Sequence, residues 1–545
     1  MAPFVSMAAL TGDTGPIHGR TPLQTQPLDV DLCLEWLHEC TASHQLCATK
    51  GDFMPTRALQ VIDPPSTETI RLVETQGLPG QYAALSHCWG TSRPCRTTRA
   101  SYDARLAGID IHELPPLFRD AVEVCQRLRI PYLWIDSLCI IQDDEADWQK
   151  ECAVMGKVYE KALLTLNVPG AADSSHSFLR PGLEAAPESC VLDVKWPSPR
   201  SHSQVNLAAV HSAQLARAHE ETDSPLERRA WVTQEYLLSP RVLSFGSVQM
   251  YFTCNEGVRF ENIIGQASQI DYLDAVVGPA PARKLQKDTL TKPSRNRYAL
   301  WYELVSHYSG KLLTYQRDRL PALSGLARRF AKDFSDDTYV AGLWRNDLVI
   351  GLLWWPARAE EIFQPPYTDR RSRDPGDRRP SWSWISCDER VLFERQYADD
   401  PDPDEITPLC VIRAVRTHPI GLDAFGEVSG GELSIEGPLT VGRGYCNVFG
   451  QPDETRPAPG TPDGDREVIN LVLSVDKPRR RHVYPARWIV FSLRLERVAG
   501  SEGVFRRVGL NRLYVTEGNS SWERVGGEDI EALIDAMDRA TVLII

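Results

Sequence analysis

Two cysteines and one histidine lie where a chain could place a nucleophile. His87 and Cys88 adjoin one another near the end of one apolar run, and Cys139 lies near the end of another. A Cys–His pair is one way to activate a thiol. However, neighbouring residues on a strand point to opposite faces, and no acid is marked to orient the histidine. We therefore expect these thiols to be buried and inert.

Asp136 is a carboxylate inside the apolar run YLWIDSLCII. A buried carboxylate without a partner is costly, so Asp136 must be paired, hydrogen-bonded or close to a water-filled crevice. Arg129, Ser137 or a nest of backbone N–H groups could serve as its partner. The residue alone indicates only that something polar lies nearby.

Glu235, in AWVTQEYL, is a second carboxylate on an otherwise apolar element. On a helix it shares one side with Trp231, Gln234 and Leu238, and it could project into a crevice. A pair with Arg228 or Arg241 is the simpler explanation. The residues by themselves favour that structural role.

Cys40, His44 and Cys47 are spaced i, i+4 and i+7, so on one continuous helix they would share a face. These are zinc-ligand types, and Cys33 lies further back on the same segment. No fourth ligand follows at a recognisable zinc-finger spacing. We therefore expect these cysteines to pack in the core and expect no metal site.

The elements that must position these residues alternate between strands and helices. In chain order they are a strand at 82–89, a helix from Pro115–Pro116, a strand at 132–141, a helix from Asp143–Asp144, a strand at 163–168, a helix at 226–238 and a strand at 241–245. This order predicts a parallel sheet covered by helices. Ligands bind such sheets beyond the carboxyl ends of the strands, which Gly90, Gln142 and Pro169 mark here. Neither GxGxxG nor GxxxxGK[ST] occurs, so a nucleotide would bind without those phosphate-cradling loops.

The remaining segments predict further domains. We expect a flexible lead-in at 1–27, a helical and strand flank at 28–80, the α/β domain at 81–260 with an insertion at 170–224, a helical and aromatic-rich segment at 290–390, and an antiparallel β-rich domain at 391–545. The apolar run Leu348–Trp355 predicts a buried strand. The Pro-, Asp- and Gly-rich segment 450–467 predicts an excursion.

Composition excludes several classes of function. The net charge of −13 argues against binding to nucleic acid or to anionic membranes. The first residues lack the basic start and apolar core of a signal peptide, and no apolar run is long enough to span a membrane. Thirteen cysteines in such a chain indicate reduced thiols, so we expect a cytoplasmic protein.

Three segments together resemble a known family. They are YAALSHCWG, LRIPYLWIDSLCIIQDDEADWQKECAVMGKVYEKA and RRAWVTQEYLLSPRVLSF, and they look like the HET domain of fungal heterokaryon-incompatibility proteins. WLHECTASHQLC before them, and YELVSHYSGKLLTYQRDRLPALSGLA and PSWSWIS after them, extend the resemblance over about residues 30–390. The resemblance implies a role in nonself recognition and programmed cell death when unlike hyphae fuse.

The HET domain is in turn remotely similar to TIR domains, which have a flavodoxin-like sheet and some of which cleave NAD at the nicotinamide–ribose bond. This implies a catalytic Glu235, with NAD as substrate rather than as a bound cofactor. It also implies substrate contacts from Ser86, His87, Trp89, Asp136 and Trp231. Val232 stands where TIR domains have a cysteine, and the insertion at 170–224 is a second departure.

Two other functions remain open at this point. One is a non-catalytic module that self-associates through the HET domain while the C-terminal β-rich region binds a protein partner. The other is a HET-fold enzyme recruited to small-molecule metabolism.

Overall fold

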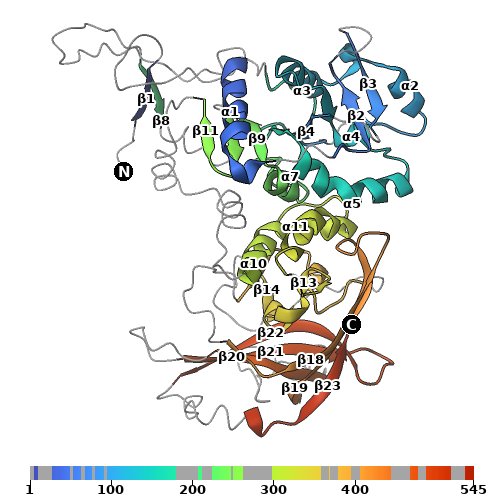
Figure 1. Cartoon of the computed structure of the whole chain (residues 1–545). Helices are drawn as coiled ribbons and strands as arrows, with labels where there is room; N and C mark the ends of the chain where they lie inside the picture. The colour runs from blue at the N-terminus through green and yellow to red at the C-terminus, as the bar shows by residue number, and fades with distance from the viewer. Residues whose placement is uncertain are drawn as a thin grey trace, which may run out of the picture. The chain divides into compact units, whose positions relative to one another are not determined.

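The computed structural model describes residues 5–9, 28–48, 53–62, 68–75, 80–90, 95–179, 207–211, 224–246, 250–261, 297–334, 336–357, 367–368, 378–394, 406–443, 467–476, 487–516 and 534–545. The chain divides into two compact units, Met1–Lys292 and Pro293–Ile545. Figure 1 colours the first from blue to green and the second from yellow-green to red.

A nine-stranded sheet forms the centre of the first unit, in the order β11-β10-β9-β7-β4-β6-β2-β3-β5. Its strands are β2 (Arg57–Gln60), β3 (Thr69–Glu74), β4 (Tyr82–Ser86), β5 (Ile109–Asp110), β6 (Tyr132–Trp134), β7 (Leu164–Asn167), β9 (Arg241–Phe245), β10 (Met250–Cys254) and β11 (Val258–Phe260). The four middle strands β6, β4, β7 and β9 are parallel. Antiparallel strands extend the sheet at both sides. The predicted parallel core is confirmed, inside a sheet that is mixed as a whole.

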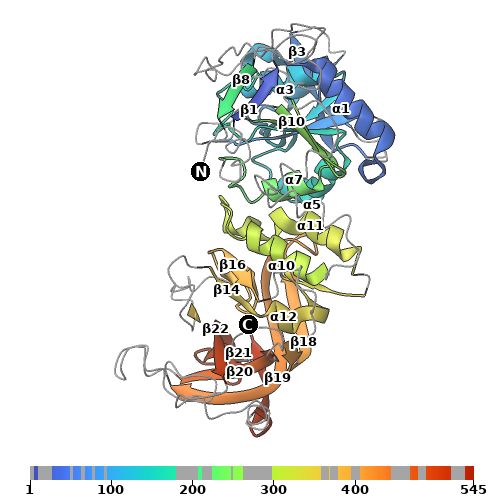
Figure 2. The same ribbon diagram turned by 90° about the vertical axis from the view of Figure 1, so that its left-hand side faces the viewer.

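The helices of this unit follow the sequence signals. They are α1 (Val30–Ser43), α2 (Tyr102–Ala107), α3 (Pro116–Arg127), α4 (Asp136–Cys139), α5 (Glu145–Lys161) and α7 (Val232–Leu238), with 3-10 turns η2 (Gln45–Cys47) and η3 (Ile111–Glu113). Proline occupies the first turn of α3, where its missing N–H is not needed. The Asp144 side chain caps α5 by accepting from the N–H groups of Ala146 and Asp147. Helices α5 and α7 pack together, and both lie along the lower side of the unit in Figures 1 and 2.

Three predicted boundaries in this unit are wrong. The strand expected at 132–141 ends at Trp134, and Asp136–Cys139 instead form the helical turn α4, with Cys139 N–H bonding to Ile135 O at 2.8 Å. A short helix that is buried on nearly every side has the same continuous apolar sequence as a buried strand. The strand expected at 82–89 ends at Ser86, and the helix expected from residue 226 begins at Val232.

The expected lead-in and the expected insertion each contain a strand. β1 (Val5–Ala9) pairs antiparallel with β8 (Leu207–His211) in a separate two-stranded sheet. The rest of 1–27, and most of the insertion at 170–224, lie outside the described residues.

The second unit begins with helices that pack around aromatic side chains. Its helical elements are α10 (Arg297–Tyr308), η6 (Gln316–Arg319), α11 (Pro321–Ala331), η7 (Arg345–Asp347), α12 (Leu348–Gly351) and η8 (Trp384–Ser386). Short strands lie among them: β12 (Tyr339–Val340), β13 (Leu343–Trp344), β14 (Trp354–Pro356) and β16 (Val391–Phe393). The buried strand expected at 348–355 is wrong, because its first half is helix α12. The indole N–H groups of Trp301 and Trp384 both donate to Gly342 O at 3.0 Å.

The C-terminal strands form the antiparallel β-rich part that the sequence predicts. They are β17 (Ile406–Pro408), β18 (Val411–Pro419), β19 (Val428–Arg443), β20 (Glu467–Asp476), β21 (Arg487–Arg497), β22 (Val504–Thr516) and β23 (Arg539–Ile544), with β15 (Tyr367–Thr368) on β22. β22 and β23 are the exception, since they pair in parallel. β19 pairs with β18, β20 and β23. The successive pairs β19–β20, β20–β21, β21–β22, β22–β23 and β23–β19 therefore join these five strands in a closed ring. The excursion expected at 450–467 lies outside the described residues apart from Glu467.

No helix in the described ranges is both long and apolar enough to cross a membrane.

Candidate functional site

Polar side chains gather where the parallel strands β4 and β6 end. Ser86 is the last residue of β4, and His87 and Trp89 follow it. Asp136 comes just after β6, as the first residue of α4. Because β4 and β6 are parallel neighbours, their carboxyl ends meet at the same edge of the sheet. Helix α7 packs against β4 and brings Glu235 to this edge.

The carboxylate of Glu235 accepts a hydrogen bond from Ser86. The distance from Ser86 Oγ to Glu235 Oε2 is 2.5 Å, and both residues are buried, with Glu235 4% exposed. Burial raises the pKa of Glu235 from its ordinary value of 4.5 to about 7, and the negative charge of Asp136 acts in the same direction. The positive charge of Arg229 and the Ser86 hydrogen bond both favour the ionised form and limit that rise. Glu235 is therefore held where it can be either protonated or ionised near neutral pH.

Two hydrogen bonds hold Asp136, which remains partly exposed. Trp89 Nε1 donates to Oδ2 at 2.7 Å, and the Ser137 N–H donates to Oδ1 at 2.7 Å. His87 Nδ1 lies 3.9 Å from Oδ1. The Asp136 side chain is 14% exposed, so its carboxylate lies at the boundary between the core and the solvent.

His87 is buried next to Asp136, and its side chain is neutral at physiological pH. Burial lowers its pKa from 6.5 to about 4, and the charge of Asp136 only partly offsets the effect. The ring packs edge-on against Phe118, with 5.1 Å between ring centroids. A neutral imidazole can donate one hydrogen bond and accept another.

Asp136 and Glu235 share one electrostatic environment. The charge of Asp136 contributes to the raised pKa of Glu235, and both carboxylates act on Tyr159. The Tyr159 hydroxyl donates to Leu85 O at 3.0 Å, beside the end of β4.

Trp231 lies one helical turn before Glu235, half-buried against the core, and its carbonyl accepts from the Glu235 N–H at 3.3 Å. The structure therefore brings Ser86, His87, Trp89, Asp136 and Glu235 together, with Trp231 beside them.

Two residues that act on the candidate site, Arg229 and Tyr159, were not identified from the sequence. The Arg229 guanidinium donates to His87 O, and its charge lowers the pKa of Glu235. Tyr159 reaches the site from α5, where the sequence indicates only a core-facing stripe. Arg229 adjoins the AWVTQE segment, so its nearness to Glu235 along the chain was the only available signal.

Of the partners expected for Asp136 and Glu235, Ser137 contacts its carboxylate and Arg241 does not. Ser137 does bind Asp136, through its backbone N–H. Arg241 donates to main-chain oxygens instead of to Glu235: its Nη2 lies 2.6 Å from Cys47 O and its Nη1 3.3 Å from Leu163 O.

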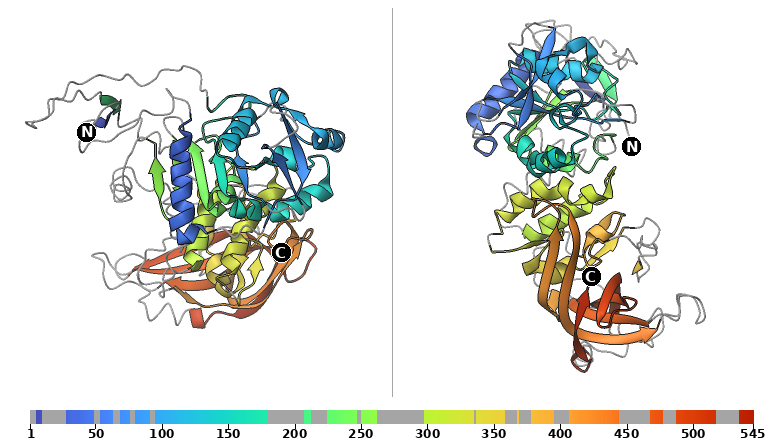
Figure 3. Two further views of the ribbon diagram at one scale, coloured as in Figure 1. Left: turned by 45° about the horizontal axis from the view of Figure 1, so that its top comes forward. Right: turned by 90° about the vertical axis from the view of Figure 1, so that its right-hand side faces the viewer.

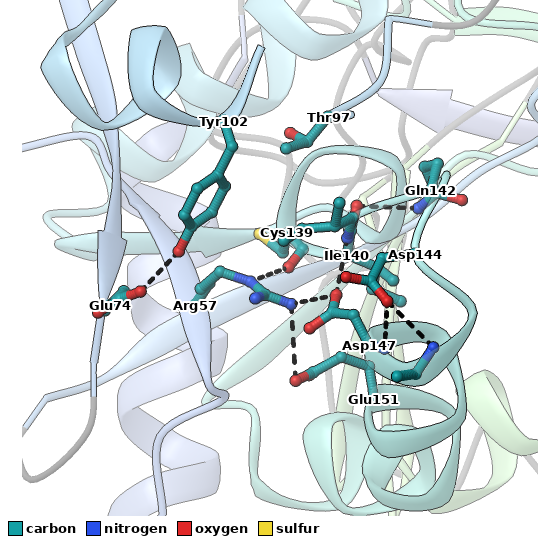
Figure 4. Close-up of polar contacts among 12 residues, drawn as sticks. Arg57, Glu74, Thr97, Tyr102, Cys139, Ile140, Gln142, Asp144, Asp147 and Glu151 are labelled. Carbon is teal, nitrogen blue, oxygen red and sulfur yellow. Dashed lines mark hydrogen bonds and ion pairs between the residues drawn. The ribbon is translucent and has the colours of Figure 1, made fainter. Parts of the chain in front are cut away.

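A buried cation fixes the segment that carries Asp136. Arg57 on β2 donates through Nε to Cys139 O at 2.7 Å and through Nη2 to Asp147 Oδ2 at 2.6 Å, with Glu151 at 3.7 Å (Figure 4). Asp147 also accepts from the Ile141 N–H at 2.8 Å. Arg57 therefore joins both ends of the link between α4 and α5, and this fixes the direction in which α4 presents Asp136.

The thiols near the site are unsuited to nucleophilic attack. Cys139 is buried, and burial raises its pKa to about 12. Burial also raises the pKa of Cys88, which packs with Leu226 and Val232. A thiol with a raised pKa is a poor source of thiolate at neutral pH.

These observations define the first unit as an α/β domain with acidic groups at the carboxyl edge of its parallel strands. Residues 82–235 match the family model described as Heterokaryon incompatibility protein (HET), so this chain contains a HET domain. The match starts at the first residue of β4 and ends at Glu235. No curated protein matches the chain, and no solved structure does.

Proposed function

We propose that this protein acts in heterokaryon incompatibility and the cell death that accompanies it, through cleavage of NAD at the nicotinamide–ribose bond. The HET domain supports the biological role. The observation that carries the chemistry is the hydrogen bond from Ser86 to Glu235 beside Asp136, at the edge of the sheet. Self-association through the HET domain and a partner for the C-terminal strands belong to the same proposal.

The order of the parallel strands supports a flavodoxin-like, and therefore TIR-like, site. From one side to the other they run β6-β4-β7-β9, which is second, first, third and fourth along the chain. Flavodoxin-like sheets have this order, and their ligands bind outside the carboxyl ends where the order reverses. The reversal here lies between β4 and β7, and Ser86 is the last residue of β4.

The proposed reaction needs one carboxylate at the ribose. The bond between ribose C1′ and the pyridinium nitrogen breaks, and its electron pair leaves with neutral nicotinamide. Positive charge then develops on the ribose ring, and ionised Glu235 stabilises it, as carboxylates do in glycoside hydrolysis. Water adds to C1′ and loses a proton to the solvent. Trp89, oriented by its bond to Asp136, offers a flat indole face to one of the rings of NAD.

The decisive experiment measures nicotinamide release from NAD by the purified full chain and by Glu235→Gln. The variant keeps the size of the side chain but cannot carry the charge, so we expect the rate to fall at least ~100-fold. Wild-type activity should rise with pH through about 7, because only the ionised carboxylate stabilises the transition state. Glu145→Gln makes the same chemical change at an exposed position on α5 and should leave the rate unchanged. Release that survives in Glu235→Gln would exclude the assigned role.

The burial of Glu235 favours a second candidate, a signalling module without catalysis. In that function the bond between Ser86 and Glu235 joins α7 to β4 and has only a structural role. The module would cause cell death through self-association, so toxicity would persist in Glu235→Gln. Absence of nicotinamide release by self-associated wild-type protein, together with toxicity of the variant, would support this candidate over the first.

A further inference from the structure

Three thiols and one imidazole meet at the edge of the first unit. The ligand atoms of Cys40, His44, Cys47 and Cys254 all lie within 4.8 Å of one another. The first three are residue types that bind zinc, and they are spaced i, i+4 and i+7 along the chain. The fourth, Cys254, is 210 positions away from His44, so no spacing in the sequence connects it with them.

The local fold explains how the first three converge without sharing one helix. Helix α1 ends at Ser43, and His44 has an extended backbone with φ −90° and ψ 110°. The 3-10 turn η2 then brings Cys47 back, with its N–H bonded to His44 O at 3.3 Å. The chain thus turns back on itself, and this brings the ligand atoms of Cys40, His44 and Cys47 within 4.8 Å of one another.

The fourth residue is held in place by bonds that do not involve the four side chains. Cys254 ends β10, and its N–H bonds to Gly257 O at 2.8 Å in the turn before β11. That turn is joined to η2 from both directions: Leu46 N–H donates to Glu256 Oε1 at 2.8 Å, and Asn255 Nδ2 donates to Leu46 O at 2.7 Å. Figure 3 (left) shows blue α1 beside the green strands that include β10.

The donor set and its dimensions fit a tetrahedral metal. Three cysteine sulfurs with one histidine nitrogen form one of the donor sets of structural zinc sites in proteins. Zn–S bonds of about 2.3 Å separate the ligand atoms of a tetrahedron by about 3.8 Å. Cys254 Sγ already lies 3.3 Å from His44 Nδ1. Cys40, Cys47 and Cys254 are 1%, 0% and 6% exposed, so the site is shielded from solvent.

A neighbouring cysteine shows what ordinary packing looks like in this region. Cys33 is buried on the same helix, and its thiol faces the thioether of Met250, with 3.5 Å between the sulfurs. Cys40, Cys47 and Cys254 instead face one another and an imidazole. Apolar packing does not call for a histidine directed at three thiols.

We propose that Cys40, His44, Cys47 and Cys254 bind one zinc ion. All four coordination positions come from the protein, so the ion is structural rather than catalytic. It joins α1 and η2, which precede the residues matching the HET family, to β10, which follows them. The zinc ligands include none of the residues assigned to NAD cleavage, so the proposal stands whether or not NAD is a substrate.

The test begins with the wild-type full chain, purified under reducing conditions. We expect one zinc per chain by elemental analysis. After exchange into cobalt(II), the protein should show thiolate-to-metal charge transfer and the visible bands of a tetrahedral complex. Wild-type protein that shows neither zinc nor these bands after reconstitution would overturn the proposal, and this measurement does not depend on the folding of any variant.

Variants then assign the ligands. Cys254→Ser and Cys47→Ser should each weaken zinc binding at least ~100-fold, while Cys33→Ser is the matched control and should retain one zinc per chain. His44→Cys should keep the metal, because a set of four cysteines also binds zinc, and should increase the charge-transfer intensity of the cobalt form. Stoichiometric, tightly bound zinc in Cys254→Ser would place the metal elsewhere and overturn the assignment.

Discussion

Folding shifts the pKa values of two buried residues at the candidate site in opposite directions. The folded state raises the pKa of Glu235 from 4.5 to about 7 and lowers that of His87 from 6.5 to about 4. Between pH 4.5 and 7 the folded chain holds a proton on Glu235 that the unfolded chain has lost, so this group reduces stability as the pH rises. Between pH 4 and 6.5 the unfolded chain holds a proton on His87 that the folded chain lacks, so this group increases stability as the pH rises. The two effects oppose each other where the ranges overlap.

Glu235→Gln should reveal this compensation. The variant removes one of the two effects, so its free energy of unfolding should increase relative to wild type by up to ~1.4 kcal/mol per pH unit between pH 4.5 and 7. Chemical denaturation at several pH values measures this difference, and Glu145→Gln serves as the control for the lost charge. A difference that is the same at every pH would show that Glu235 titrates normally in the folded protein.

At the residue scale, the sequence indicated most residues of the candidate site but did not connect Cys254 with Cys40, His44 and Cys47. Asp136 and Glu235 stand out because a carboxylate in an apolar run needs a reason, and Ser86 follows from the order of the resembling segments. Arg229 acts through space on Glu235, and Cys254 reaches His44 only through the pairing of β9 with β10. Neither relation leaves a periodic signal along the chain.

At the element scale, Arg57 holds β2, α4 and α5 together with one buried guanidinium. Arg57→Ala should cost about 3–5 kcal/mol of stability, because it leaves the buried Glu151 and the partly buried Asp147 without their cation. Thermal and chemical unfolding measure the loss. The matched control is Arg99→Ala: the Arg99 side chain is 65% exposed and 3.1 Å from Asp144, so its pair should contribute at most about 1 kcal/mol. Equal effects of the two substitutions would contradict the structural role of Arg57.

The elements differ in how well the sequence predicted them. β7 and β9 carry clear starts and stops, and their predicted bounds hold to within a residue; α3 begins at the predicted Pro116 but ends at Arg127, before the expected stop at Pro131. α4 and α12 were expected as strands because each is a single helical turn inside a continuous apolar run. Periodicity needs several turns to separate a helix from a strand, and these elements supply only one.

At the scale of the whole molecule, the fragments 1–292 and 293–545 should each fold when expressed alone, since each unit is compact by itself. Each should show a single cooperative thermal transition by circular dichroism. A fragment limited to 82–235 should not, because it lacks β2 beside β6 and β9 beside β7, and so exposes two unpaired edges of the sheet. Cooperative unfolding of that short fragment would show that the flanking strands are dispensable.

The position of Cys254 also has a consequence for synthesis on the ribosome. Helix α1 is the first described helix of the chain to be made, yet the strand it packs against, β10, follows some 210 residues later. At translation rates of about 5–20 residues per second, that interval is about 10–40 s. Throughout it Trp36 lacks its later neighbour Phe252, and the thiols and imidazole near the end of α1 lack the thiol of Cys254. Helix α1 is therefore completed only after β10 has been made, so the nascent chain depends during this interval on whatever shields the apolar face of α1 and keeps its cysteines reduced.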